Sequence, residues 1–259
     1  MNILDEIIAN KKIEVAERKK IVSIDDLIKS EYFDRQTLSL KKNLRESATG
    51  IIAEFKRKSP SKSWIYENAD ALSITSGYAA ASASGISILT DEKYFGGTPA
   101  DIIMARPQVA CPILRKEFIV DEYQIYEAKA MGADLILLIA AALTPRQTKD
   151  FARKAGKLNL EILLEIHNEG ELAHANEFVD MIGVNNRNLK TFVTDIQTSF
   201  DLAEKIPAEF VKVSESGISQ AQTVLELRKA GFEGFLMGEN FIKTANPAET
   251  LKNFINELK

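Results

Sequence analysis

The chain has 259 residues, 45% of them hydrophobic and 27% charged, and its formal net charge at pH 7 is −4. One α/β barrel can fill this length, and the apolar share is enough for a sizeable core. The slightly acidic balance argues against nucleic acid as the main partner, because proteins that bind a duplex carry a basic patch or stripe.

The first 48 residues are predicted to form a helical extension ahead of the main fold. Apolar residues at positions 3, 4, 7 and 8 have helical spacing, and a run rich in Lys, Glu and Arg follows through Lys20. The segment 23–26 resembles a capping box and indicates a second short helix. We interpret the charged run as a solvated helix face rather than a docking surface.

From residue 50 onward, a short apolar run, a polar or glycine-containing loop and a helical stretch follow one another repeatedly. The apolar runs start roughly 20 to 35 residues apart, which fits one strand, one helix and two connections. This repeat predicts an α/β fold, the (β/α)8 TIM barrel, and we expect residues 1–259 to form a single domain. The apolar runs are Ile51–Phe55, Ile86–Leu89, Ile113–Arg115, Leu135–Ala140, Ile162–Ile166, Met181–Val184, Phe210–Val213 and Gly234–Met237.

An open, doubly wound sheet is the structural alternative to the barrel. Such a sheet normally carries a glycine-rich dinucleotide-binding turn after its first strand. In this chain the first predicted strand is followed instead by Lys56 to Ser61, with the sequence KRKSPS.

Charged and polar residues occupy the carboxyl ends of the predicted strands, the face where barrel enzymes place their active sites. We expect Glu54, Lys56, Lys116 and Glu165 to converge at this mouth. Burying such charges is unfavourable unless they pair, and their convergence shifts pKa values in ways that suit acid–base catalysis. The alternative is that some of them only decorate a solvated rim. Other strand ends carry Arg115 to Glu117, Asn185 to Arg187, Ser214 to Gly217, and Gly238 to Asn240.

The last two strand ends predict a phosphate site. Ser216 to Ile218 and Gly238 to Asn240 each place a glycine after a strand, where backbone N–H groups can approach an anion. The loops after strands seven and eight are the usual phosphate-binding loops of barrel enzymes. An ordinary strand-to-helix turn is the simpler interpretation of the same residues.

Long motifs resemble the indole-3-glycerol-phosphate synthase family. The segment from Ile51 to Ser61 resembles the first-strand signature of that family, and the resemblance extends over the whole barrel. The other matching segments are Leu89 to Gly97, Pro112 to Phe118, Leu164 to His167, Ile182 to Leu189, and Ser214 to Ile218.

The resemblance implies an enzyme that converts 1-(o-carboxyphenylamino)-1-deoxyribulose 5-phosphate into indole-3-glycerol phosphate, carbon dioxide and water, without a metal or other cofactor. By position, Lys116 resembles the general acid and Glu165 the base of the later steps. Glu54 and Asn185 resemble residues that orient the anilino nitrogen and a hydroxyl group, and Lys56 a partner of the substrate carboxylate or hydroxyl or a second acid. Which lysine acts in which step stays open.

The resemblance also implies residues that bind the substrate. Ser59, Ser216, Gly217 and Gly238 are expected at the phosphate, with Ser216 also assigned to the catalytic group. Further residues assigned to the site are Phe95 and Phe118 for an apolar wall, and Arg187 and Glu215 for support of ring closure. Leu189 is assigned to substrate binding in general. Core packing is the alternative for Phe118.

Glu239 is a departure from the family pattern, because many members carry a serine after the glycine of strand eight. A carboxylate aimed at a phosphate would repel it. We therefore expect only the backbone N–H of Glu239 to contact the ligand, with its side chain turned away.

Two histidines and one cysteine argue against a metal site. His167 is interpreted as a group behind the reacting residues, and His174 as a surface residue on a helix. Trp64 and Tyr66 are assigned to a mobile loop over the site.

We expect a monomer or a weak homo-oligomer in the cytoplasm, with a small phosphorylated substrate and neither nucleic acid nor membrane as partner. The one cysteine, Cys111, cannot form an internal disulfide and suits a reducing compartment. The start of the chain lacks the pattern of a secretory signal, and the longest apolar run, Leu135 to Leu143, is too short to span a bilayer.

Three other functions share some of these features. A class I aldolase would form a Schiff base on a strand-end lysine such as Lys116. Barrels that isomerise phosphoribosyl compounds share the phosphate loops but not the Glu-x-Lys motif followed by Ser-Pro-Ser. A silent phosphate-ligand sensor or scaffold would be favoured if one of the four converging charged residues were missing, and none is.

Overall fold

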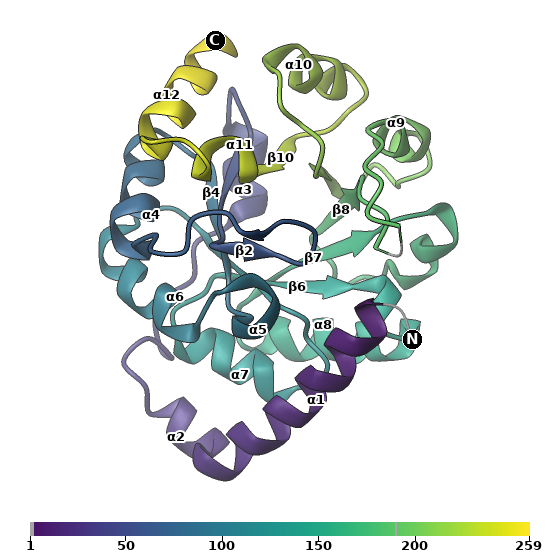
Figure 1. The fold of residues 1–259 in the computed structure, drawn as a ribbon. Coiled ribbons are helices and arrows are strands. Elements are labelled where there is room, and N and C mark those ends of the chain that lie inside the picture. Colours follow the sequence, from purple (N-terminus) through teal and green to yellow (C-terminus); the bar gives the residue numbers. More distant parts are fainter. Residues whose placement is uncertain (1–2, 190) are drawn as a thin grey trace.

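The predicted barrel is confirmed. The structure is a computed structural model that describes residues 3–189 and 191–259, so the first two residues of the expected extension 1–48 lie outside it. Parallel strands close into a barrel in the order β1-β10-β9-β8-β7-β6-β5-β4, with helices around it (Figure 1). The barrel strands are β1 (Ile51–Phe55), β4 (Gly85–Leu89), β5 (Ile113–Lys116), β6 (Leu135–Ile139), β7 (Glu161–Ile166), β8 (Met181–Asn185), β9 (Val211–Glu215) and β10 (Gly234–Met237).

Side-chain alternation along the strands separates two cores. One set of strand residues, among them Ile52, Leu114 and Leu163, packs inside the barrel. The alternate set, among them Ile51 and Ile113, packs outward against the helices. Because side chains in a strand point to opposite faces in turn, this register fixes which strand-end residues face the barrel axis.

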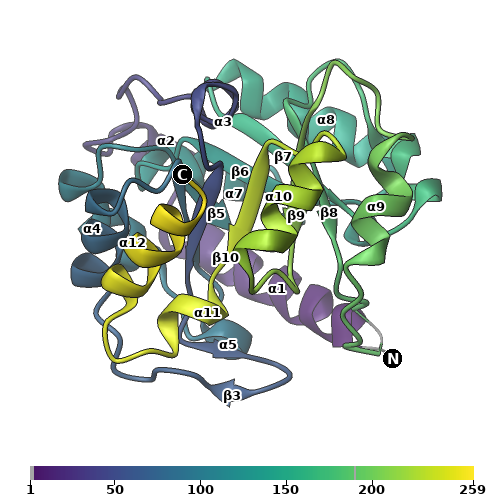
Figure 2. The ribbon, with the colours of Figure 1, turned by 90° about the horizontal axis from the view of Figure 1, so that it is seen from above.

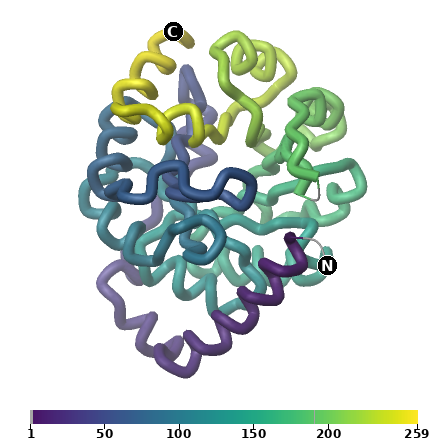
Figure 3. Tube along the Cα trace, in the orientation of Figure 1, coloured from purple at the N-terminus to yellow at the C-terminus, as the bar shows by residue number. Residues whose placement is uncertain are grey.

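Helices cover the outside of the barrel, as the tube in Figure 3 also shows. After β7, the outer layer contains only the 3-10 helix η3 (Glu169–His174) in place of an α-helix. His174 is buried there with its Nδ1 2.8 Å from the Thr148 hydroxyl, so the expected surface position of His174 is wrong. The outer helices are α4 (Ala71–Ala80), α6 (Pro99–Ala105), α7 (Tyr123–Ala130), α8 (Pro145–Lys157), α9 (Gln197–Ala203), α10 (Ala221–Lys229) and α12 (Pro247–Glu257).

Short elements line the loops at the mouth. After β1 the chain forms a small hairpin, β2 (Lys58–Ser59) and β3 (Ser63–Trp64), that lies over one side of the mouth (Figure 2). Helix α5 (Glu92–Phe95) follows β4, and α11 (Glu239–Ile242) follows β10. Two short 3-10 helices are also present: η1 (Arg106–Gln108) precedes β5, and η2 (Ala140–Ala142) follows β6.

The N-terminal extension reaches both ends of the barrel. Helix α1 (Ile3–Ile21) begins at the mouth, α2 (Ile24–Ile28) lies beside α7, and α3 (Leu40–Glu46) closes the opposite end. Leu40 and Leu44 of α3 belong to the inner core. The extension is therefore part of the packed structure.

The charged run of α1 is not simply a solvated face. Lys19 and Lys20 are exposed as expected, but Lys11 is fully buried and pairs with the carboxylates of Asp91 and Glu117. The expectation of a solvated surface is wrong at this position, because helical periodicity turns Lys11 to the same side as Leu4, Ile7 and Val15.

We predict that Asp134→Asn destabilises the protein without changing the chemistry at the mouth. The buried Asp134 carboxylate accepts hydrogen bonds from Arg35, Arg106 and the backbone N–H groups of Leu38 and Ile113, which ties the extension to the barrel. An amide would aim its own donors at these donors, so we expect the free energy of unfolding to fall by about 3 kcal/mol.

Urea denaturation of the variant and its parent measures this effect. Asp150→Asn on the outside of α8 is the control and should stay within about 0.5 kcal/mol of the parent. An Asp134→Asn variant as stable as the parent would contradict the assigned role.

Candidate active site

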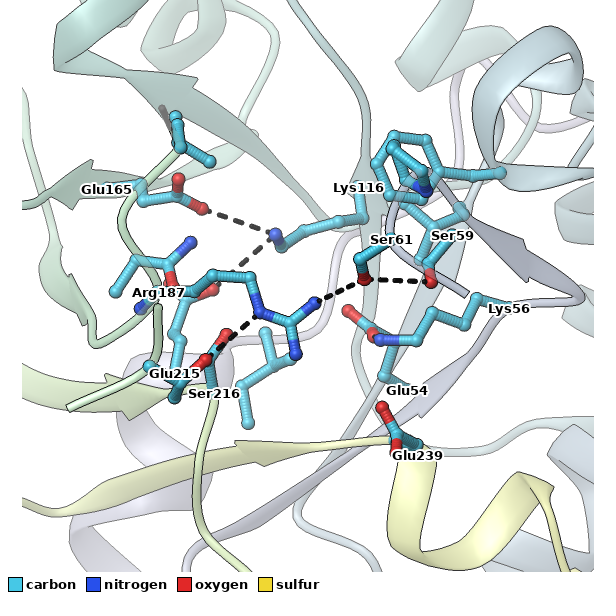
Figure 4. Close-up of a pocket in the computed structure, with 18 of the residues that line it drawn as sticks. Glu54, Lys56, Ser59, Ser61, Lys116, Glu165, Arg187, Glu215, Ser216 and Glu239 are labelled. Carbon is cyan, nitrogen blue, oxygen red and sulfur yellow. Dashed lines mark hydrogen bonds and ion pairs between the residues drawn. The ribbon is translucent and has the colours of Figure 1, made fainter. Parts of the chain in front are cut away.

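A cavity of about 360 Å³ opens at the mouth of the barrel, where the strands end. Every residue assigned above to catalysis or substrate binding lines this cavity, and Figure 4 shows the polar ones converging from different strands. They are Glu54, Lys56, Ser59, Phe95, Lys116, Phe118, Glu165, Asn185, Arg187, Leu189, Glu215, Ser216, Gly217, Gly238 and Glu239. The barrel thus brings together residues that lie up to 185 positions apart (239 − 54).

Lys116 is at the centre of the charged group. Its ammonium lies 3.2 Å from Oε2 of Glu165 and 3.5 Å from Oε2 of Glu215, and the Glu54 carboxylate also acts on it electrostatically. The four side chains belong to β5, β7, β9 and β1, and the alternation that puts Leu114 inside the barrel also turns Lys116 inward.

The pKa values in this group move apart. Burial lowers the pKa of Lys116, but Glu165, Glu215 and Glu54 raise it more, so the ammonium stays charged. Burial raises the pKa of Glu165, but Lys116 and His167 more than reverse this, so Glu165 is ionised. The pKa of Glu215 is raised, because burial and the Glu165 and Glu54 carboxylates outweigh the attraction of Lys116.

Lys56 and Glu54 form a second pair at the end of β1. The Lys56 ammonium lies 2.6 Å from Oε1 of Glu54. Opposite them, a Cβ built on Gly238 would lie 2.9 Å from the Cβ of Glu54 and 3.0 Å from its carbonyl oxygen. Glycine at 238 therefore allows the end of β10 to approach the end of β1 this closely.

Arg187 links the end of β8 to the hairpin after β1. Its backbone N–H donates to Oδ1 of Asn185 and its Nε to the hydroxyl of Thr194. Its terminal nitrogen donates to Ser61, whose hydroxyl lies 3.5 Å from that of Ser59 (Figure 4). Two hydroxyls and a guanidinium thus lie together on the side of the cavity where the phosphate was expected.

The turn after β9 has a left-handed backbone at two successive residues. Ser216 and Gly217 both have positive φ, at +67° and +79°. Asn186 holds this turn by donating from its side-chain nitrogen to the carbonyl oxygens of Glu215 and Ser216. Successive N–H groups in such a turn can point toward one anion.

Glu239 pairs with Lys62 of the hairpin. The Lys62 ammonium holds the pKa of Glu239 below its usual value, although partial burial acts to raise it. Glu239 lines the cavity, and its carboxylate is held by this lysine. That the side chain turns away from a bound phosphate stays a prediction.

Apolar residues close the other side of the cavity. The rings of Phe95 and Phe118 lie 6.0 Å apart, and Leu189 also lines the wall. Helix α1 contributes Leu4 and Ile7. The contribution of α1 was missed from the sequence, because helical spacing shows an apolar face but not what that face covers.

Gly183 was also missed. A Cβ built on Gly183 of β8 would lie 2.3 Å from Oε1 of Glu215, so glycine leaves the space that this carboxylate occupies. A glycine inside a predicted strand was the available signal, since it often marks a close approach.

His167 lies behind Glu165, as expected for a supporting group. Its Nε2 is 3.4 Å from Oε1 of Glu165, an ion-pair contact without hydrogen-bond alignment, and its backbone N–H donates to Glu171. Burial lowers the pKa of His167, but the two carboxylates raise it to about 10, so the imidazole is cationic at neutral pH.

The described residues contain neither a metal-binding group nor a helix that could span a membrane. His, Cys, Asp and Glu side chains in residues 3–189 and 191–259 form no group that could hold a metal ion. In the same part of the chain, no helix has both the length and the apolar character of a membrane span.

Sequence comparisons agree on one family. A family model described as indole-3-glycerol phosphate synthase matches residues 4–254. A protein of that name from Bacteroides thetaiotaomicron is 53% identical over 258 residues, which cover 100% of this chain and 99% of the relative. Another from Thermoanaerobacter pseudethanolicus is 40% identical, with 99% of this chain and 98% of the relative covered.

Solved structures resemble the chain in fold alone. A mutant tryptophan synthase alpha-subunit from Pyrococcus furiosus matches with a TM-score of 0.60 at 18% identity, covering 81% of this chain and 97% of that one. The flavin-binding domain of baker's yeast flavocytochrome b2 matches with a TM-score of 0.62 at 13% identity, covering 81% and 62%.

We predict that protonated His167 stabilises the fold at neutral pH. Its folded pKa of about 10 exceeds the ordinary 6.5, so its contribution is fully present below pH 6.5 and is lost as the pH rises through 10. Between pH 7 and 10 the free energy of unfolding should fall by roughly 3 kcal/mol more in the parent than in His167→Gln.

Chemical denaturation at several pH values measures the slope. His174→Gln is the matched control, because burial lowers the pKa of His174 and it is neutral throughout this range. Parallel pH curves for the parent and His167→Gln would contradict the assignment.

Proposed function

The chain belongs to the indole-3-glycerol phosphate synthase family, and from that premise we propose which side chains carry out its reaction. The enzyme is a carboxy-lyase of tryptophan biosynthesis that converts 1-(o-carboxyphenylamino)-1-deoxyribulose 5-phosphate into indole-3-glycerol phosphate, carbon dioxide and water. The observation that carries the assignment of roles is one largely buried ammonium, Lys116, facing the cavity among three carboxylates.

Lys116 acts on the substrate ketone. Ring closure forms a carbon–carbon bond between the carboxyl-bearing aromatic carbon and the ketone carbon, and it places negative charge on the ketone oxygen. A charged, preorganised ammonium stabilises that charge more in the transition state than in the ground state, and it then supplies the proton. Loss of carbon dioxide returns its bonding electrons to the ring and restores aromaticity.

Glu165 acts as the base of the dehydration step. In the ligand-free site Lys116 and His167 hold its pKa low, which makes it a weak base. When Lys116 turns to the substrate oxygen, Glu165 loses its strongest partner and its basicity rises. It then removes a proton while a lysine protonates the departing hydroxyl, which leaves as water.

The pair of Glu54 and Lys56 orients the part of the substrate that carries the carboxylate and the anilino nitrogen. Lys56 has a pairing partner that an incoming substrate carboxylate can replace, and it is also placed to serve as a second acid. Glu54 and Asn185 accept and direct hydrogen bonds from the anilino nitrogen and the hydroxyl group. Glu215, with its raised pKa, exchanges a proton with Lys116 more readily than an ordinary carboxyl would.

Substrate binding divides between the polar and apolar sides of the cavity. The hydroxyls of Ser59 and Ser216 and the backbone N–H groups at Gly217, Gly238 and Glu239 bind the phosphate. Lys62 screens the carboxylate of Glu239 from that phosphate. Support of ring closure falls to Arg187, and the apolar wall that receives the aromatic ring is formed by Phe95, Phe118 and Leu189.

The single cysteine bears on the compartment in which the protein acts. The partly buried free thiol of Cys111, whose pKa burial raises to about 11, suits a reducing cytoplasm. We propose that the chain acts there as one domain, as a monomer or a weak homo-oligomer.

We predict that Lys116→Ala reduces kcat at least 1,000-fold, because it removes the group that stabilises the ketone oxygen. Purified parent and variant are mixed with the substrate, and the appearance of indole fluorescence is followed. Lys149→Ala on the outside of α8 is the matched control and should retain the parent rate.

Each alternative gives a different result. A parent that binds the substrate tightly without turnover would favour a silent ligand sensor. Irreversible labelling of Lys116 on borohydride treatment with substrate would favour an aldolase that forms a Schiff base. Lys116→Ala turning over at the parent rate would overturn the assignment of the acid.

A further inference from the structure

A ring of charges joins α1 to the ends of β4 and β5. The ammonium of Lys11 lies 2.8 Å from Oδ2 of Asp91, 3.1 Å from Oε1 of Glu117 and 2.9 Å from Oε2 of Glu14. The guanidinium of Arg115 lies 3.8 Å from Oε2 of Glu117 and 3.2 Å from Oε2 of Glu127, which extends the ring to α7. Arg18 of α1 pairs with both Glu127 and Glu14, and this closes the ring. We call these seven residues, Lys11, Glu14, Arg18, Asp91, Arg115, Glu117 and Glu127, the α1 charge ring.

Lys11 is the buried cation through which α1 enters this ring. Its side chain is 0% exposed, and the side chains of Asp91 and Glu117 are 1% and 0% exposed. Charges buried this completely are tolerated only when they are paired. Without Lys11, two carboxylates would remain under α1 with their shared cation gone.

Both carboxylates belong to segments that build the active site. Asp91 caps α5, which carries Phe95, by accepting from the N–H of Tyr94. Glu117 follows Lys116 directly and accepts from the N–H of Phe118 and the hydroxyl of Thr90. Lys11 therefore fixes α1 against the two loops that carry the aromatic wall.

The first turns of α1 complete that wall. Leu4 and Ile7 line the cavity, and they share the inner core with Phe118, Leu137 and Ile139. Lys11 lies one helical turn beyond Ile7 on the same face, between Ile7 and the buried Val15. Lys11 is the charged residue on the buried face of α1, beside Leu4, Ile7 and Val15.

We infer that Lys11 is a positioning residue for substrate binding: its ammonium docks α1 on the loops after β4 and β5, and so holds Leu4 and Ile7 in the wall that receives the substrate's aromatic ring. The inference rests on the proposed function for the nature of that ring. It requires no contact between Lys11 and the substrate.

Lys11→Met tests the inference, because methionine keeps the length of the side chain and removes its charge. We expect KM for the substrate to rise at least tenfold while kcat falls less than threefold, since the contacts of Lys116 with Glu165 and Glu215 do not involve α1. Lys12→Met, on the exposed neighbour, is the control and should leave both constants within twofold.

A purely structural role gives another result. If Lys11→Met lowers the melting temperature but leaves KM within twofold of the parent, the inference is overturned. If Lys11→Met does not fold, the double variant Leu4→Ala/Ile7→Ala, which keeps the ring intact, takes its place. It should raise KM at least tenfold, and an unchanged KM would overturn the inference.

Failure of the proposed function can be told apart from failure of this inference. A parent without turnover contradicts the assigned reaction and leaves the role of Lys11 testable by substrate binding. The dissociation constant from a fluorescence titration should then rise at least tenfold in Lys11→Met, and an unchanged constant would overturn the inference.

Discussion

The active site depends on one interaction, the contact of the largely buried Lys116 ammonium on β5 with carboxylates from the alternate strands β7 and β9. A cation at this place is stable only because Glu165 and Glu215 neutralise it, and carboxylates at this place are stable only because of the cation. The closed barrel imposes the arrangement, since the inward set of alternating side chains at the carboxyl ends can lie nowhere else. The shifted pKa values of the group follow from that confinement.

Two adjacent residues at the end of β5 point to opposite sides of the barrel sheet. Lys116 points to the cavity, whereas Glu117 points outward to Lys11 and Arg115. The outer charges therefore hold the loop after β5 through Glu117, without contact to a reacting atom. Helix α1 therefore does more than cover the barrel. Its buried Lys11 pairs with Glu117, and Glu117 is the residue that follows the catalytic Lys116 in the chain.

The sequence predicted the barrel and the residues at its mouth well, for a physical reason. Strand periodicity and the placement of Glu54, Lys116 and Glu165 at strand ends are local properties that survive without coordinates. Burial between elements is not local. Lys11 lies in a run of charged residues that is typical of an exposed helix, and His174 has neighbours that are typical of a surface helix. Both are buried because distant segments, the loops after β4 and β5 and the face of α8, cover them.

The cations of the cavity are paired before any substrate arrives, which shapes how a substrate with a carboxylate and a phosphate can bind. Lys56 contacts Glu54, Lys62 contacts Glu239, and Arg187 contacts Ser61. An anion that reaches Lys56 or Lys62 exchanges with a carboxylate that is already in place, so the electrostatic gain of binding at these lysines is smaller than their charges alone suggest. The benefit lies in geometry. Each cation is held near its working position, so little side-chain entropy remains to be lost on binding, and the released carboxylates Glu54 and Glu165 become stronger acceptors where the reaction needs them.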